Sequence, residues 1–121
     1  MNPPLFPIVS ADSAVRSVLG TNPVRVFPFG GADENTVLPY AVWQVVGGEP
    51  ENYLGNPPDA DSFLTQIDVY AKTGLAARAC ALALRNALEP HAHIVSWRGE
   101  SKDQTTGNFR YSFDINFITA R

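Results

Sequence analysis

The sequence predicts an α+β domain: a mostly antiparallel sheet of about five strands with two helices packed on one face. Three observations predict this class. Residues 63–71 alternate apolar and polar side chains with a period of two, which is typical of a half-buried strand. Residues 75–88 change to the period of a helix. Residues 109–117 alternate most strongly, with aromatic or aliphatic side chains at odd positions and polar ones at even positions.

Length and composition indicate one domain over residues 1–121. A chain of this length buries roughly two-thirds of the surface that its unfolded form exposes, and its 45% apolar content is that of a globular protein. The single cysteine, Cys80, excludes an internal disulfide. Because there is no run of 18 apolar residues, we expect no membrane segment and synthesis in the cytoplasm. The net charge of −3 argues against a general phosphate-binding surface.

The first elements follow from capping residues and apolar spacing. Ser10 is a candidate N-cap for a first helix, Val15 and Leu19 lie on its apolar stripe, and Gly20 closes it. A short strand is expected over residues 24–27. The nearly continuous apolar run over residues 39–46 predicts a more central strand.

A long loop is expected over residues 47–62, where sixteen residues show no periodicity. Tyr53 and Leu54 lie in its middle, where a passive linker would be polar. Two interpretations remain open: the loop folds back on its own domain, or it is an arm that contacts a partner.

The second helix is expected to begin after Thr73, whose hydroxyl can cap it. Leu75, Ala79, Leu82 and Ala83 are expected to form its apolar stripe, with Leu84 and Leu88 beside it. Arg78 and Arg85, seven residues apart, share a face. A strand over residues 94–98, a polar loop over 99–108 and the strand over 109–117 complete the sheet.

Catalytic, cofactor-binding and metal sites are not predicted. The pair His91 and His93 lacks a third ligand with suitable spacing, and Gly30-Gly31 lacks the other residues of a phosphate-binding loop. Asp68 and Asp114 could imitate a carboxylate pair for acid–base chemistry. An alternating polar strand face needs such residues anyway, so we expect no enzyme; a small-ligand-binding or enzymatic α+β domain is the alternative.

Short segments in a particular order resemble the tail-completion, or tail-terminator, family of long-tailed bacteriophages, formerly a domain of unknown function. The segments run nearly end to end: Pro4-Leu5-Phe6, Leu19-Gly20, Arg25-Val26-Phe27-Pro28, Leu38-Pro39-Tyr40-Ala41-Val42-Trp43-Gln44, Gln66-Ile67-Asp68-Val69-Tyr70-Ala71 and Arg110-Tyr111-Ser112-Phe113-Asp114. The resemblance implies a structural virion protein without catalytic motif or cofactor.

The same resemblance implies a homo-oligomeric ring, typically a hexamer, at the head-proximal end of the tail in the virion. Its partners would be other copies of itself, the tail-tube protein and the head-side connector protein, and DNA would pass through without specific binding. Another head–tail connector or minor virion adaptor is the alternative within the virion.

Charge distribution and strand alternation suggest two sets of site residues. Residues 1–61 have a net charge of −5 and residues 62–121 one of +2, which is either an ordinary solvated surface or a sign that acidic loops of one copy meet basic residues of another. The expected subunit or partner contacts are Glu49, Glu51, Tyr53, Leu54, Asp59, Asp61, Arg78 and Arg85. The expected lumen-facing residues are Gln66, Asp68, Ser112, Asp114 and Asn116.

The lumen hypothesis assigns a role to the two aspartates. Their carboxylates would repel passing DNA, which carries about one negative charge per 1.7 Å of axis. Under this hypothesis, lysines at Asp68 and Asp114 leave the fold intact and slow genome ejection at low salt. In a monomer, the same face would simply be wet.

Overall fold

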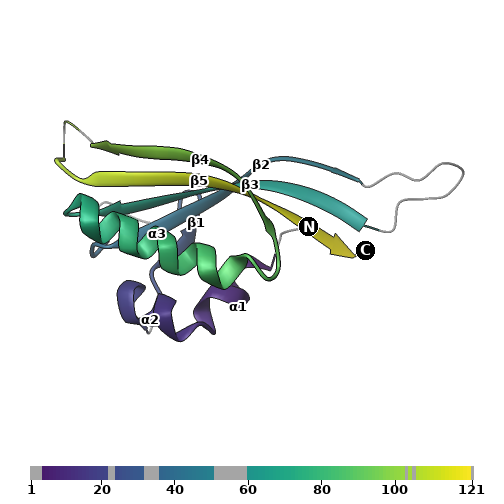
Figure 1. The fold of residues 1–121 in the computed structure, drawn as a ribbon, viewed down its shortest axis with the longest axis horizontal. Coiled ribbons are helices and arrows are strands. Elements are labelled where there is room, and N and C mark those ends of the chain that lie inside the picture. Colours follow the sequence, from purple (N-terminus) through teal and green to yellow (C-terminus); the bar gives the residue numbers. More distant parts are fainter. Residues whose placement is uncertain are drawn as a thin grey trace, which may run out of the picture.

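The computed structural model describes residues 4–21, 24–31, 36–50, 60–102, 104 and 106–120. Within these residues, the strands form one sheet in the order β1-β2-β3-β5-β4 (Figure 1). Strand β1 pairs with β2 in parallel, and the other neighbours are antiparallel. The elements are α1 (Leu5–Ser10), α2 (Ser13–Leu19), β1 (Val26–Pro28), β2 (Tyr40–Pro50), β3 (Ala60–Ala71), α3 (Gly74–Leu88), β4 (His93–Lys102) and β5 (Phe109–Ala120). The predicted α+β class is confirmed, with three helices in the described residues where two were expected.

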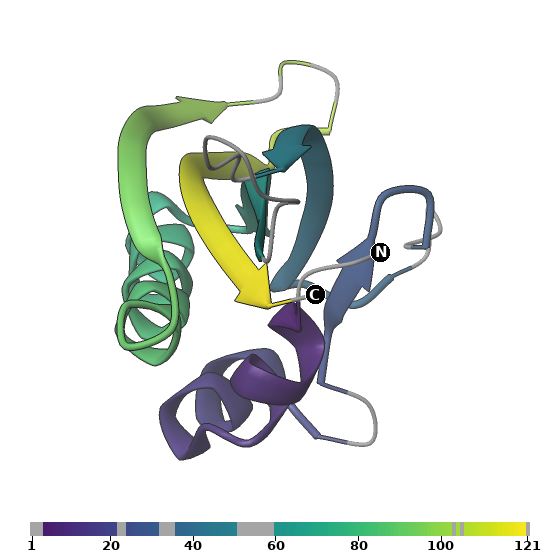
Figure 2. The same ribbon diagram turned by 90° about the vertical axis from the view of Figure 1, so that its right-hand side faces the viewer.

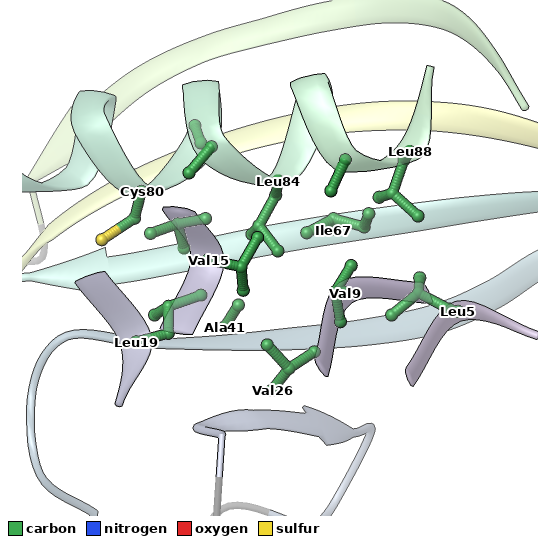
Figure 3. Packing of buried hydrophobic residues seen from close by; sticks show 14 of the residues in the cluster. Leu5, Val9, Val15, Leu19, Val26, Ala41, Ile67, Cys80, Leu84 and Leu88 are labelled. Carbon is green, nitrogen blue, oxygen red and sulfur yellow. The ribbon is translucent and has the colours of Figure 1, made fainter. Parts of the chain in front are cut away.

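All three helices lie on one side of the sheet (Figures 1 and 2). Helix α3 contacts β3, β5 and β4, while α1 and α2 pack against α3. Between these layers lies the apolar core, in which Leu84 and Leu88 of α3 meet Ile67 of β3 and Val9 and Val15 of the first two helices (Figure 3). Each such buried side chain contributes about 1.5–3 kcal/mol.

Helix α3 begins where the sequence indicated, because the Thr73 hydroxyl accepts a hydrogen bond of 3.1 Å from the Ala76 amide. Its expected apolar stripe was wrong at two leucines: Leu75 is 77% exposed and Leu82 46% exposed. The buried stripe instead passes through Ala77, Cys80, Ala81, Leu84 and Leu88. These positions follow the same i, i+3, i+4 spacing. The small residues among them let the helix approach the sheet closely.

The N-terminal helical region consists of two short helices. Asp12, not Ser10, is the N-cap of α2, since its carboxylate accepts a hydrogen bond of 3.0 Å from the Val15 amide. Ser10 ends α1 and donates its hydroxyl to the Pro7 carbonyl at 3.4 Å. Gly20 closes α2 with φ +83°, as expected for a C-terminal glycine.

The strands are longer than expected. The loop expected over residues 47–62 was too long: residues 47–50 belong to β2 and residues 60–62 to β3, and Pro50 pairs with Asp61. The ladder continues because extended backbones pair through main-chain groups and need no side-chain alternation. Beyond the end of α3, β2 and β3 run on away from the helices (Figure 1). Strand β4 likewise extends through residues 99–102, which were expected to be loop.

Candidate functional site on the open face of the sheet

The side of the sheet turned away from the helices carries two clusters of hydrogen-bonded polar side chains; we call it the open face. Pairing registers place its side chains in transverse rows across β2, β3, β5 and β4. The three central rows are Tyr40–Tyr70–Arg110–Ser101, Val42–Asp68–Ser112–Gly99 and Gln44–Gln66–Asp114–Ser96. The predicted residues Gln66, Asp68, Ser112, Asp114 and Asn116 therefore share one face.

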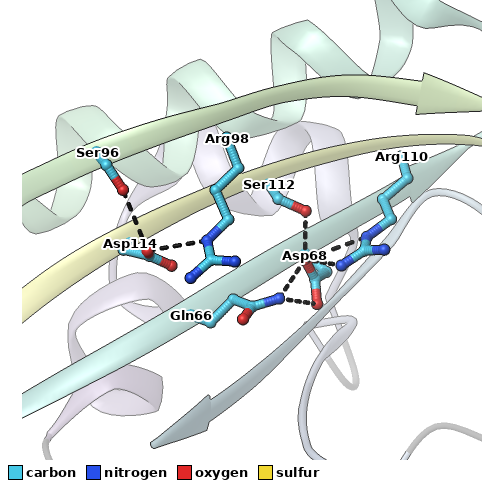
Figure 4. Close-up of polar contacts among 7 residues, drawn as sticks. All are labelled: Gln66, Asp68, Ser96, Arg98, Arg110, Ser112 and Asp114. Carbon is cyan, nitrogen blue, oxygen red and sulfur yellow. Dashed lines mark hydrogen bonds and ion pairs between the residues drawn. The ribbon is translucent and has the colours of Figure 1, made fainter. Parts of the chain in front are cut away.

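Asp68 is the centre of the first polar cluster (Figure 4). Arg110 donates to its Oδ1 from Nη2 at 3.0 Å and from Nε at 3.3 Å. The Ser112 hydroxyl also donates to Oδ1. The Gln66 side-chain amide donates to Oδ2 at 3.1 Å. Three neighbouring positions on two strands thus satisfy one carboxylate.

Asp114 is the centre of the second cluster, one row further along (Figure 4). Its Oδ2 accepts hydrogen bonds from Arg98 Nε at 2.9 Å and from the Ser96 hydroxyl at 3.1 Å. Its Oδ1 is buried and has no hydrogen-bond partner among the described residues. Beyond it, the Ser62 hydroxyl donates to Asn116 Oδ1 at 2.8 Å, so the polar pairing continues toward the hairpin end of β3.

In both clusters the aspartate side chain is buried and the arginine side chain is partly exposed. The side chains of Asp68 and Asp114 are 10% and 7% exposed, whereas those of Arg110 and Arg98 are 41% and 51% exposed. The face thus presents guanidinium groups whose charge is compensated from below. A buried carboxylate needs such a partner, since an unpaired charge away from water is costly.

Sequence reasoning named the carboxylates and missed Arg98, Arg110 and Ser96. The signal for Arg110 was present, because it alternates with Ser112 and Asp114 on one strand. Ser96 and Arg98 flank Trp97 in the same alternation. Their role depends on β4 pairing with β5, and on bulges at residues 94–96 and 97–99 that set the register.

At one end of the open face the polar rows give way to aromatic rings. Tyr40 stacks on Tyr70 with ring centroids 5.2 Å apart, and Phe27 meets Tyr40 edge-on at 6.5 Å. Partial burial raises the pKa of the Tyr40 hydroxyl above its ordinary value. This phenol therefore stays protonated at neutral pH and offers no base.

The predicted contact residues Arg78 and Arg85 lie on the helical side, where α3 and β4 border a groove of about 350 Å³. Arg78 Nη2 lies 2.8 Å from Glu100 Oε1. Arg85 lies over the Trp97 ring, with its Cζ 5.8 Å from the ring centroid. Both arginines share a face of α3, as their spacing predicted.

The structure does not place the side chains of the other residues in the expected contact set. Glu51, Tyr53, Leu54 and Asp59 lie outside the described residues. Glu49 and Asp61 belong to the backbones of β2 and β3, and their side chains are not described. Their part in a contact stays a prediction.

The described residues include no candidate metal site. No group of three or more His, Cys, Asp or Glu side chains that could hold a metal occurs among these residues. Asp68 Oδ1 and Asp114 Oδ2 each accept hydrogen bonds from an arginine and a serine hydroxyl. Within the described part of the chain, no helix is long and apolar enough to cross a membrane.

Comparisons with known proteins agree with this arrangement. A sequence model of the family described as tail completion protein gp17 matches residues 3–120. Among solved structures, a chain in the virion of a native gene transfer agent particle is similar, with a TM-score of 0.66 and 11% sequence identity, over 97% of this chain and 92% of that one. That likeness concerns the fold. The search of curated proteins gave no significant match.

Proposed function

This chain belongs to the tail completion protein gp17 family, and we propose that it forms a ring that terminates the phage tail tube and joins it to the head-side connector. As a family member it is a structural protein of the virion tail. The observation that carries the proposal is the extent of the match, which runs from α1 through β5. The family's role is thus assigned to the whole sheet-and-helix unit and not to a peripheral segment.

The shape of the subunit supports assembly by head-to-tail contacts. The ends of β2 and β3 run past α3 on one side (Figure 1), whereas the groove beside Arg78 and Arg85 lies between α3 and β4. Two different surfaces at different places favour heterologous contacts, which close into a ring when the rotation between subunits permits it. The resemblance to tail terminators suggests six copies.

In this ring, we place the open face toward the lumen, with Gln66, Asp68, Ser112, Asp114 and Asn116 in the wall. What supports this placement is the scarcity of exposed large apolar groups in its central rows and the compensation of each arginine by a buried carboxylate. DNA moving past would meet guanidinium groups already engaged by acids. The wall would then neither bind nor strongly repel the phosphates.

The chemistry of that wall differs from the sequence-based expectation. Asp68 and Asp114 do not face solvent, so direct repulsion of DNA by bare carboxylates is not supported. Lysines at both positions would place ammonium groups beside Arg110 and Arg98 in buried sites. We therefore expect the Asp68→Lys, Asp114→Lys chain to be destabilised, contrary to the expectation that it folds normally.

The proposal is tested by joining heads to tails in vitro. Tails from particles lacking this chain are mixed with filled heads, with and without the purified chain, and joined particles are counted by electron microscopy. We expect joining only when the chain is added, with native mass spectrometry finding a closed oligomer on the tube end. Joining without the chain, or its incorporation at another place in the particle, would favour the minor-adaptor alternative.

A further inference from the structure

A groove between α3 and β4 has the features of a docking site. Its volume is about 350 Å³, and it is lined by Arg78, Ala81, Leu82, Arg85, Trp97 and Tyr111. Leu82 and Trp97 are 46% and 42% exposed, so two large apolar groups meet water side by side with two arginines. Apolar groups gathered between charged ones are typical of an interaction surface.

The arginines of the groove are held in place but not fully engaged. Arg78 is paired with Glu100 in an exposed ion pair, and such pairs contribute little because water screens them. Arg85 forms an ion pair with Glu89 Oε1 at 3.7 Å and donates from Nη2 to Asn86 Oδ1 at 3.2 Å, and its side chain is 34% exposed. An incoming carboxylate can therefore pair with the exposed parts of both guanidinium groups, whose present partners are partly exposed side chains.

We propose that this groove receives residues 51–59 of a second copy of the chain, an inference that rests on the proposed ring and names its subunit contact. That segment places Tyr53 and Leu54 between acidic residues. Together with its flanks it carries Glu49, Glu51, Asp59 and Asp61 and no lysine or arginine. The apolar pair fits the Leu82–Trp97 floor, and the acids fit the two guanidinium groups.

The backbone of this segment is too short to reach the groove of its own subunit. The groove lies over the rows of Ile67 and Val69, which pair through β5 with Trp97 and Glu100 of β4. Those rows are about 20–27 Å along β3 from Asp61, and β4 lies about 10 Å to the side. Nine residues anchored at both ends reach at most about 17 Å from their anchors. This shortfall favours an occupant from another chain and hence a heterologous contact.

Pairing of engineered thiols tests the contact directly. Tagged Leu54→Cys chains are mixed with untagged Leu82→Cys chains under mild oxidation, and disulfide-linked heterodimers are counted. The matched control replaces Leu82→Cys by Leu75→Cys, which lies on the same helix, outside the groove, and is more exposed. Native Cys80 does not compete, because it is buried and burial raises the pKa of its thiol.

We expect the Leu82 mixture to give about tenfold more heterodimer than the Leu75 mixture, because docked thiols react at a high effective concentration. Equal yields, or no heterodimer at Leu82, would overturn the contact. Ring formation is read separately by native mass spectrometry of the uncross-linked wild type. Closed rings without the Leu54–Leu82 link would overturn this inference alone; linked chains that never close would overturn the ring alone.

Charge reversal gives a second, independent arm. Arg78→Glu with Arg85→Glu should reduce assembly, Glu51→Lys with Asp59→Lys should reduce it as well, and a chain with all four changes should regain it. Circular dichroism checks that each variant folds. If the quadruple variant assembles no better than either double variant, the proposed charge pairing is contradicted.

Discussion

Asp68 lies on the open face with its carboxylate covered by Arg110, Ser112 and Gln66. Its neighbour Asp114 is covered in the same way by Arg98 and Ser96. Each acid orients an arginine that is roughly half exposed. At the scale of single residues, the face is therefore a set of fixed, compensated ion pairs, with hydrogen bonds that define side-chain positions on both strands.

Removal of Arg110 tests how far this pairing stabilises the fold. Arg110→Met keeps much of the aliphatic length but leaves the Asp68 carboxylate buried without its cation. We expect the free energy of unfolding to fall by about 1–3 kcal/mol in urea denaturation. Lys72→Met is the control, since Lys72 is an exposed cation at the end of the same sheet, and it should change stability by less than about 0.5 kcal/mol. Equal losses would show that the ion pair is unimportant.

Cys80 gives the chain a predicted dependence on alkaline pH. Burial raises the pKa of its thiol, and the nearby Arg25 partly opposes this. The unfolded chain therefore loses the thiol proton at a lower pH than the folded chain. The resulting stabilisation is complete below the ordinary thiol pKa, about 8.5, and is lost as the pH rises through the raised value.

Cys80→Ala should accordingly flatten the decline of unfolding free energy above about pH 8.5. Urea denaturation of both chains across the neutral and alkaline range measures the difference in slope. Burial also raises the pKa of Tyr40, but that group is present in both chains and cancels in the comparison. Parallel curves for the two chains would contradict the account of the thiol.

At the scale of elements, α3 depends on which of its leucines face the sheet. Leu84 is fully buried between the helical layer and β3 (Figure 3), while Leu75 on the same helix is 77% exposed. We expect Leu84→Ala to lower the unfolding free energy by about 2–5 kcal/mol. Leu75→Ala should change it by less than about 0.5 kcal/mol. Thermal or urea unfolding measures both changes. Similar losses in the two variants would contradict the assignment of the Leu84 side of α3 to the core.

That helix also illustrates what the sequence can predict. The Thr73 cap and the change of period at residue 75 are local features; the cap is confirmed, and α3 begins one residue earlier, at Gly74. The choice between the Leu75–Leu82 stripe and the Leu84–Leu88 stripe is not local, because both satisfy helical spacing. It is made by the sheet and by α1 and α2, which bury one side of the helix.

In the candidate site, too, local features could be predicted and tertiary ones could not. Strand alternation predicted correctly that Asp68, Ser112 and Asp114 share a face, because a period of two fixes the side of each residue. Alternation says nothing about how deeply a side chain is covered. The burial of the carboxylates depends on Arg98 and Arg110 reaching over them from β4 and β5, and hence on strand order and on the bulges of β4. Residues 47–50 were misassigned to a loop because glycine and proline there hide an extended ladder.

At the scale of the whole molecule, the compensated open face is suited to a channel that DNA passes through. Asp114→Asn should keep the shape of the site and leave Arg98 free to bind a phosphate. We expect slower genome ejection at low salt, and a steeper salt dependence of DNA retention by about 0.9 per new phosphate contact. Arg98→Met added to Asp114→Asn removes the free cation and should restore normal ejection. Unchanged ejection in the single variant would contradict a lumen position for this face.

The central claim is that copies of this chain close head to tail into a ring at the head-proximal end of the tail. Cryo-electron microscopy of intact particles, with this subunit fitted at that end, measures it most directly. We expect a closed ring on the last layer of the tube, with residues 51–59 of each copy on the α3–β4 groove of the next and Arg98 and Arg110 facing the lumen. A subunit located elsewhere in the particle, or a ring closed through the open faces, would contradict it.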